Sequence, residues 1–195
     1  MILVTGATGN VGGKVLALLR ADGHKVRALT RDPGRAAFDG GADLEVVAAD
    51  LGRPETLAPA LDGVQKVFLM VARREQGDDT TRIWWPPRAR RASSTSCSCP
   101  PSGWRWPRTR RATPLGHWHR VAEEALRDSG IAWTILRPNG FMSMNLGLGR
   151  VDQGPREWPA GRSRDVPEAI VDPRDIAEVA VRALTGEGHR GQVYD

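Results

Sequence analysis

Short apolar runs alternate with helical apolar stripes along the first part of the chain. The run from Ile2 to Val4 is followed by Thr5-Gly6, which predicts a buried strand that ends in a sharp turn. Apolar residues then recur with helical spacing until Asp22-Gly23, which predicts an amphipathic helix lined by Val11, Val15, Leu16, Leu18 and Leu19. Further strands are predicted over residues 25–30, 44–48 and 66–72. This order predicts an α/β fold of the Rossmann type, with a doubly wound parallel sheet.

The alternation resumes after residue 113. A helix is predicted over residues 117–129, closed by Ser129-Gly130, with one face formed by Val121, Ala122, Ala125 and Leu126. A strand over residues 131–136 follows. A capped helix then begins after Asp172, with one face formed by Ile176, Val179, Ala180, Ala183 and Leu184. Val193-Tyr194 resembles the start of another strand, so we expect the chain to be truncated at its C-terminus and its substrate-side region, residues 147–195, to be incomplete.

Three glycines follow the first strand at a spacing that is typical of phosphate-binding turns. Gly6 permits a tight turn, Gly9 lets the backbone approach a pyrophosphate, and Gly12 lets the next helix pack closely on the strand. The helix N-terminus then directs its unpaired N–H groups at the anion. A glycine triplet alone could be an ordinary turn. Here strand, turn, helix and second strand occur in order, which favours a dinucleotide cofactor.

The second strand ends in Thr30-Arg31-Asp32-Pro33, which bears on the choice of cofactor. An acidic residue at this point usually holds the ribose 2′-hydroxyl of NAD, whereas an Arg accommodates the 2′-phosphate of NADP. Arg31 comes first and favours NADP. Asp32 keeps NAD possible, and Arg31 could instead be a solvated loop charge.

Composition adds bounds to this picture. A chain of 195 residues with 40% apolar content suits a single domain over residues 1–195. The N-terminus shows no cationic leader, and no apolar run is long enough to cross a bilayer, so we expect a cytoplasmic protein without a membrane partner. Cys97 and Cys99 are the only cysteines and lack a second ligand pair, so no metal is expected. The sequence leaves the oligomeric state open.

One anomalous segment accounts for the positive charge. Nine of the chain's 28 basic residues, and no Asp or Glu, lie between residues 80 and 122, and without them 19 basic residues face 23 acidic ones. Within it, residues 83–112 contain five prolines and, after Ile83, no Val, Leu, Ile or Phe. These residues should supply the fourth helix and the buried fifth strand of the sheet. Their composition instead predicts that this helix and central strand are missing or disordered.

Three interpretations of residues 83–112 compete. The Arg and Trp residues could form an arm that binds nucleic acid, or the segment could be a disordered surface insertion. Of these interpretations, we favour the nucleic-acid arm less than the frameshift described next. The third interpretation is translation in the wrong frame, which the composition supports. In a frame offset by two bases, the first base of each codon becomes a middle base, and a middle T encodes only Phe, Leu, Ile, Met or Val.

Most Ser, Cys and Trp codons begin with T. With free choice of wobble bases, ASSTSCSCPPSGWRWP can be back-translated so that the offset frame reads VEHVVLLSAVGVEMA, an apolar strand. The chain's 25 Arg against 3 Lys also fit a GC-rich gene, in which off-frame reading yields Arg, Pro, Ser and Trp. We therefore hypothesise that a pair of frameshifts brackets residues 83–112.

The remaining motifs resemble a known family. VTGATGNVG, VRALTRDP, Asp50-Leu51, HWHRVAEEALRDSGIAWTILRP and VDPRDIAEVAVRAL together are similar to the NmrA-like group of atypical short-chain dehydrogenases, over residues 1–72 and 113–195. That group is similar to quinone reductases, triphenylmethane reductases and some redox-sensing regulators that bind NADP without turning it over. The resemblance implies that the pyrophosphate lies against Gly6, Thr8, Gly9, Asn10 and Val11, with Gly12 completing the motif. It also implies that Arg31 meets the ribose phosphate and that Asp50 and Leu51 lie beside the adenine.

The catalytic residues depart from the usual pattern. Typical short-chain dehydrogenases need a Tyr and a Lys four residues apart, because the Tyr exchanges a proton while the cofactor exchanges a hydride. Here the only tyrosine is Tyr194, and the equivalent position would be Leu115. His119 falls where related reductases carry the Lys, so it is the candidate catalytic residue. The alternative is a half-exposed histidine in the first turn of a helix.

Phe141 and Met142 follow a strand end and are candidates for the apolar wall of an acceptor pocket, or for core packing. The sequence thus predicts an NADPH-dependent oxidoreductase that transfers hydride to a quinone-like or other small conjugated acceptor. The alternatives are a redox-sensing regulator that binds NADP without turnover and an inactive frameshifted remnant.

The frameshift hypothesis predicts a second frame in the gene. Sequencing genomic DNA across codons 80–115 should reveal compensating changes of frame, and mass spectrometry of the purified protein should detect the offset peptides. An uninterrupted frame in the DNA, together with peptides that match the printed residues 83–112, would contradict it.

Overall fold

The fold is built on one parallel sheet. The computed structural model describes residues 1–70, 93–97, 114–138, 140–141 and 170–195. Seven strands form the main sheet in the order β3-β2-β1-β4-β5-β6-β9, and every neighbouring pair is parallel. Their bounds are β1 Ile2–Val4, β2 Val26–Thr30, β3 Leu44–Ala48, β4 Lys66–Met70, β5 Ser93–Cys97, β6 Trp133–Leu136 and β9 Gln192–Tyr194. All carboxyl ends therefore meet at one edge, where this architecture binds ligands.

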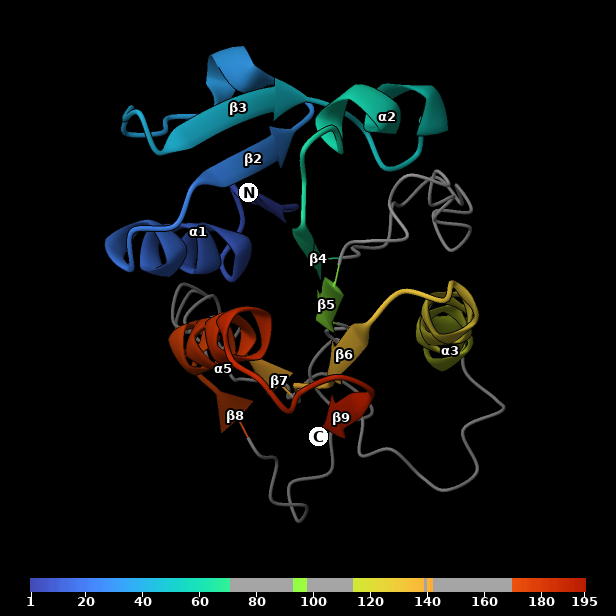
Figure 1. Cartoon of the computed structure of the whole chain (residues 1–195). Coiled ribbons are helices and arrows are strands. Elements are labelled where there is room, and N and C mark those ends of the chain that lie inside the picture. Colours follow the sequence, from blue (N-terminus) through green and yellow to red (C-terminus); the bar gives the residue numbers. More distant parts are fainter. Residues whose placement is uncertain (71–92, 98–113, 139, 142–169) are drawn as a thin grey trace, which may run out of the picture.

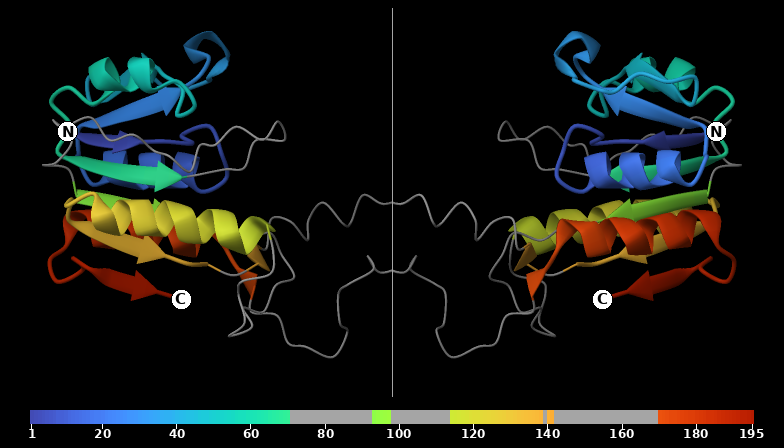
Figure 2. Two further views of the ribbon diagram at one scale, coloured as in Figure 1. Left: turned by 90° about the vertical axis from the view of Figure 1, so that its right-hand side faces the viewer. Right: turned by 90° about the vertical axis from the view of Figure 1, so that its left-hand side faces the viewer.

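Helices cover both faces of this sheet. Helices α1 (Gly12–Ala21) and α5 (Pro173–Thr185) lie on one face, and α2 (Leu57–Ala60) and α3 (Pro114–Asp128) lie on the other (Figures 1 and 2). Short 3-10 turns, η1 (Pro33–Arg35) and η2 (Pro54–Thr56), follow β2 and β3. Strands β7 (Gly140–Phe141) and β8 (Ile170–Val171) form a separate parallel pair. The predicted Rossmann-type, doubly wound fold is confirmed.

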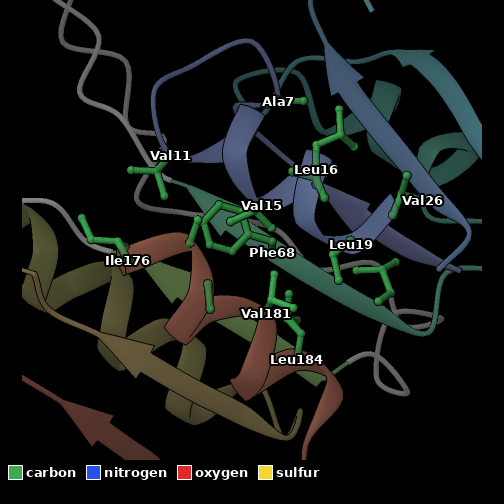
Figure 3. Packing of buried hydrophobic residues seen from close by; sticks show 14 of the residues in the cluster. Ala7, Val11, Val15, Leu16, Leu19, Val26, Phe68, Ile176, Val181 and Leu184 are labelled. Atoms are coloured by element: carbon green, nitrogen blue, oxygen red, sulfur yellow. The ribbon is translucent and has the colours of Figure 1, made fainter. Parts of the chain in front are cut away.

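The core lies on both faces because β1 is buried along its whole length. Ile2 and Val4 join the cluster formed with α1 and α5, whereas Leu3 joins the cluster on the α2 side. Figure 3 shows the side chains of α1 and α5 meeting over Phe68 of β4, with Val15 and Leu19 from α1. Sixteen buried apolar residues of the described part of the chain, each 0% to 7% exposed, make up this cluster, and the burial of their apolar surface holds α1 and α5 on the sheet.

Two helix faces differ from the sequence prediction. On α5, Val179 is 45% exposed, and the buried face is formed by Pro173, Ile176, Ala177, Ala180, Val181 and Leu184. The apolar stripe follows positions i, i+4 and i+8 from Ile176, and Val179 falls beside it. On α3, Val121, Ala122 and Ala125 are only half-buried, and among residues 119–128, whose burial is described, His119, Glu123 and Leu126 are buried. The buried face of α3 is therefore partly polar.

The central strand β5 differs from one part of the fold prediction. The composition of residues 83–112 predicts that the central strand is missing or disordered, yet Ser93–Cys97 pairs with β4 on one side and β6 on the other. A run of Ser and Thr avoids proline and is free to adopt extended backbone, so composition alone did not exclude it. Its polar residue types contrast with the buried Val67, Phe68 and Leu69 of β4. The rest of residues 83–112, and residues 147–167, lie outside the described residues.

The strand predicted at Val193-Tyr194 is present in the structure. Val193 and Tyr194 do form a strand, β9, whose partner is β6. The backbone N–H of Arg137 donates to the carbonyl of Tyr194 at 2.8 Å, which continues the ladder past the end of β6.

A substitution at Gly12 tests the packing of α1 on β1. A Cβ at this position would lie 2.2 Å from the Gly6 carbonyl oxygen, and backbone cannot yield as a flexible side chain does. We expect Gly12→Ala to lower the free energy of unfolding by about 2 to 3 kcal/mol, as overpacking does. Urea denaturation measures the change.

Gly40→Ala is the matched control, because a Cβ there would meet nothing within 4 Å. It should change the free energy of unfolding by less than about 0.5 kcal/mol. Equal stability of the two variants would show that the contact between Gly12 and Gly6 does not hold α1 in place.

Candidate functional site

The glycine loop turns sharply as it leaves β1. Thr5 extends the pairing with β4, since its N–H donates to the Phe68 carbonyl at 3.0 Å and its hydroxyl accepts from the Met70 N–H at 2.7 Å. Gly6 then takes φ +61°, a conformation that side chains rarely allow. The Gly9 N–H donates to the Gly6 carbonyl at 2.8 Å, which closes the turn.

Helix α1 begins where this loop ends. Its N-cap residue is Val11, and none of the described side chains caps that end of the helix. Thr8, Gly9 and Asn10 are exposed, whereas Val11 and Gly12 are buried. Val11 packs into the core with 2% exposure, so it can offer a ligand only its backbone. The loop is thus a cradle of backbone groups at a helix N-terminus, and such an end attracts an anion.

The backbone of the cradle is uncovered at Gly9. Among the described residues, a Cβ at Gly9 would meet one atom within 4 Å, the Gly6 carbonyl oxygen at 3.2 Å. Glycine at this position therefore keeps the approach to the backbone clear. The residues that are present fit a dinucleotide on this test.

Arg31 and Asp32 lie at the next strand end. Asp32 caps η1, since its Oδ1 accepts from the Gly34 N–H at 3.1 Å. Its own N–H donates to the Thr30 hydroxyl at 3.3 Å. The Asp32 carboxylate is therefore engaged in shaping its own loop, while Arg31 is exposed beside it.

Asp50 and Leu51 follow β3. The Asp50 Oδ1 accepts from the Gly52 N–H at 2.9 Å, and the Asp50 N–H donates to the Thr56 hydroxyl at 3.0 Å. Leu51 is half-buried and packs against the core cluster on the α2 side. Because β3, β2 and β1 are neighbours, the structure gathers the glycine loop, Arg31 and the Asp50-Leu51 pair along one stretch of the edge (Figure 1).

The candidate catalytic and acceptor residues lie on the other half of the molecule. His119 is 1% exposed and lies in the second turn of α3, which begins at Pro114, so the half-exposed alternative in a first turn is wrong. Phe141 in β7 is half-buried and packs against the main core cluster. Met142 lies outside the described residues. Tyr194 is the last residue of β9, and His189 precedes that strand. The hydroxyl of Tyr194 lies 2.7 Å from Nδ1 of His189.

Sequence reasoning missed an ion-pair network beside His119. The Arg137 guanidinium donates to both carboxylate oxygens of Glu123, from Nε at 2.8 Å and from Nη2 at 2.6 Å. Its Nη1 lies 3.3 Å from Oδ1 of Asp195. Donating these hydrogen bonds to Glu123 raises the pKa of Arg137 above its ordinary value, so Arg137 stays charged. Two sequence features could have indicated this ion pair: an acidic residue one helical turn after His119, and an Arg at the end of the next strand.

Two negative observations apply to the described part of the chain. No helix there is long and apolar enough to cross a membrane. No group of three His, Cys, Asp or Glu side chains among the described residues could hold a metal ion.

Sequence comparisons point to NAD(P)H-dependent proteins. A family model described as NAD(P)H-binding matches residues 6–187. A (4-alkanoyl-5-oxo-2,5-dihydrofuran-3-yl)methyl phosphate reductase from Streptomyces griseus is 40% identical over 198 residues, covering 100% of this chain and 66% of that protein. The NAD(P)H azoreductase of Xenophilus azovorans is 32% identical, with 100% and 66% covered. For quinone oxidoreductase 2 of Escherichia coli the values are 30%, 100% and 68%.

The chain therefore spans about two thirds of the length of these relatives, at 66% to 68%.

Solved structures agree on the fold. An NADPH-dependent quinone oxidoreductase of Escherichia coli complexed with NADPH has a TM-score of 0.75 and 26% identity, covering 100% of this chain and 68% of that one. The triphenylmethane reductase of a Citrobacter species complexed with NADP(H) has a TM-score of 0.73 at 23% identity, covering 99% and 68%. The glycine loop, the strand order and these matches show that the chain belongs to the NAD(P)H-binding family.

Proposed function

We propose that the chain binds NADPH at the carboxyl edge and transfers its hydride to a small conjugated acceptor. One observation carries the proposal: a backbone cradle lies at the N-terminus of α1, where Gly6 makes the turn, Gly9 leaves the backbone uncovered and Gly12 lets the helix approach. Thr8 and Asn10 are exposed there and could donate to the pyrophosphate. Asp50 and Leu51 would flank the adenine.

The choice of NADP over NAD rests on Arg31. One carboxylate oxygen of Asp32 already accepts a hydrogen bond from the Gly34 N–H, at 3.1 Å. This bond reduces the capacity of Asp32 to accept from a ribose hydroxyl. Arg31 is exposed at the end of β2 and can supply charged donors to a 2′-phosphate.

The acceptor class is supported by the names of the relatives. They are reductases of a quinone, an azo compound and a 5-oxo-2,5-dihydrofuran, and each of these groups contains a conjugated multiple bond. When bound, the dihydronicotinamide supplies the hydride, and the acceptor takes up a proton to complete the reduction. A quinone-like acceptor mostly needs positioning, so the missing Tyr does not exclude turnover.

The chain's own residues would hold and enclose the acceptor. His119 would orient the nicotinamide ribose or relay the proton, and Phe141 with Met142 would form an apolar wall. Within the family we assign the chain to the NmrA-like group, acting in the cytoplasm on a small molecule rather than on nucleic acid. The motif HWHRVAEEALRDSGIAWTILRP supports that assignment.

Removing Arg31 tests the cofactor preference. We expect Arg31→Ala to raise the Kd for NADPH about tenfold, because a charge-assisted hydrogen bond to the 2′-phosphate is lost. The Kd for NADH should change less than about twofold, because NADH lacks that phosphate. Fluorescence titration with both nucleotides measures this.

Arg35→Ala is the matched control, since Arg35 is also exposed and ends η1 in the same loop. It should leave both Kd values near those of the unmodified chain. Equal losses of NADPH and NADH affinity in Arg31→Ala would contradict the assignment of Arg31 to the 2′-phosphate.

Turnover tests the enzymatic proposal. NADPH oxidation should be measured with a panel of quinones, azo dyes and unsaturated lactones. We expect turnover with at least one class, and a fall in kcat of about tenfold to hundredfold in His119→Ala, as for loss of a proton-transfer group.

Two other results would overturn this function in different ways. Tight NADPH binding without turnover would instead support the redox-sensing regulator. Absence of saturable binding would leave the inactive remnant.

A further inference from the structure

We propose that Glu123 and Arg137 form a positioning pair that holds His119 at the reaction centre. This inference rests on the proposed function, since it concerns the same site. It adds two residues that act through His119 without contacting the cofactor or the acceptor.

The pair has the geometry of a rigid fork. Nε and Nη2 of Arg137 reach separate oxygens of Glu123, at 2.8 and 2.6 Å. Such bidentate pairing fixes the orientation of both groups as well as their separation. The Glu123 side chain is only 5% exposed, so water does not compete freely for its oxygens. Arg127 adds a contact to Oε2 of Glu123 at 3.1 Å from the next turn of the helix.

The fork joins three elements at the carboxyl edge. Glu123 belongs to α3, and Arg137 is the first residue after β6. The backbone N–H of Arg137 donates to the carbonyl of Tyr194 in β9, and its Nη1 approaches Asp195. The pair therefore sets both the height and the rotation of α3 relative to the ends of β6 and β9.

His119 depends on that rotation. It precedes Glu123 by four residues, so the two side chains lie one turn apart on the same face of α3. Both are buried, at 1% and 4% exposure. Because α3 runs antiparallel to β6 (Figure 2), His119 lies nearer the carboxyl edge than Glu123 does. Turning or sliding the helix at Glu123 would displace His119 from that edge.

A role in stability alone does not explain a buried carboxylate here. Burying a charged pair carries a desolvation cost, and well-packed apolar residues often serve a core equally well. The same helix carries an ordinary surface pair for comparison. Arg120 and Glu124 lie 3.0 Å apart with side chains 53% and 51% exposed, and they face away from the buried stripe.

The test compares Glu123→Gln and Arg137→Lys with the matched control Glu124→Gln. Glu123→Gln keeps the shape of the side chain and removes its charge, and Arg137→Lys keeps the charge and removes the fork. We expect kcat to fall about tenfold to hundredfold in both, as for a catalytic group displaced by about 1 Å, with the Kd for NADPH within about twofold. Glu124→Gln should leave kcat unchanged.

A double-mutant cycle shows whether the effect passes through His119. In the His119→Ala background, Glu123→Gln should lower kcat no further, because the group that it positions is gone. An equal further fall in that background would overturn the inference. So would a normal kcat in folded Glu123→Gln protein.

A readout without turnover separates this inference from the proposed function. The ring signals of His119, assigned with His119→Ala, should shift or split in the NMR spectrum of Glu123→Gln and stay in place in Glu124→Gln. Unchanged His119 signals in Glu123→Gln would overturn the positioning role, whatever the activity. If the signals move but the unmodified chain oxidises no NADPH, the proposed function fails and the structural coupling stands.

Discussion

The close approach of α1 to the end of β1 is the contact on which the site depends. No side chain fits between Gly12 and the Gly6 carbonyl, because a Cβ at Gly12 would lie 2.2 Å from that oxygen. This contact places the N-terminus of α1 directly beyond β1, so that its free N–H groups face the edge of the sheet. It also lets Val11, Val15 and Leu19 enter the core, which couples the cradle to the packing beneath it.

The parallel sheet divides that edge into two halves. Strands β3, β2 and β1 end in groups that suit a nucleotide: Asp50 with Leu51, then Arg31, then the glycine loop. Strands β6 and β9 end in Arg137 and Asp195, which tie α3 to the sheet through Glu123. Between the halves lies β5, whose Ser and Thr residues stand where parallel sheets usually carry branched apolar ones. Apolar packing supports both halves, and on the β6 side the part-buried Arg137–Glu123 pair adds a charged contact between α3 and the sheet.

The sequence was sufficient for features whose signal is local. The glycine spacing, the bounds of β1 and β3, and the positive-φ glycine just after α3, Gly130, all depend on a few consecutive residues. The fork at Glu123 was missed because its partner is 14 residues away, and the adjacent acidic residues Glu123 and Glu124 on a helix suggest a solvated face. Val179 was misplaced for a related reason, since two adjacent apolar stripes of α5 are equally good until the sheet selects one. Composition misled us at β5, because pairing with two neighbours decides whether a short polar run becomes a strand.

Calorimetric titration of NADPH into the chain and into Gly9→Asp tests the central claim most directly. The cradle works only if Gly9 leaves its backbone open to the pyrophosphate, and an aspartate there adds both bulk and a like charge. The account predicts saturable binding to one site in the unmodified chain and its loss in folded Gly9→Asp protein. Equal NADPH affinity in the two proteins, or no saturable binding to the unmodified chain, would contradict it.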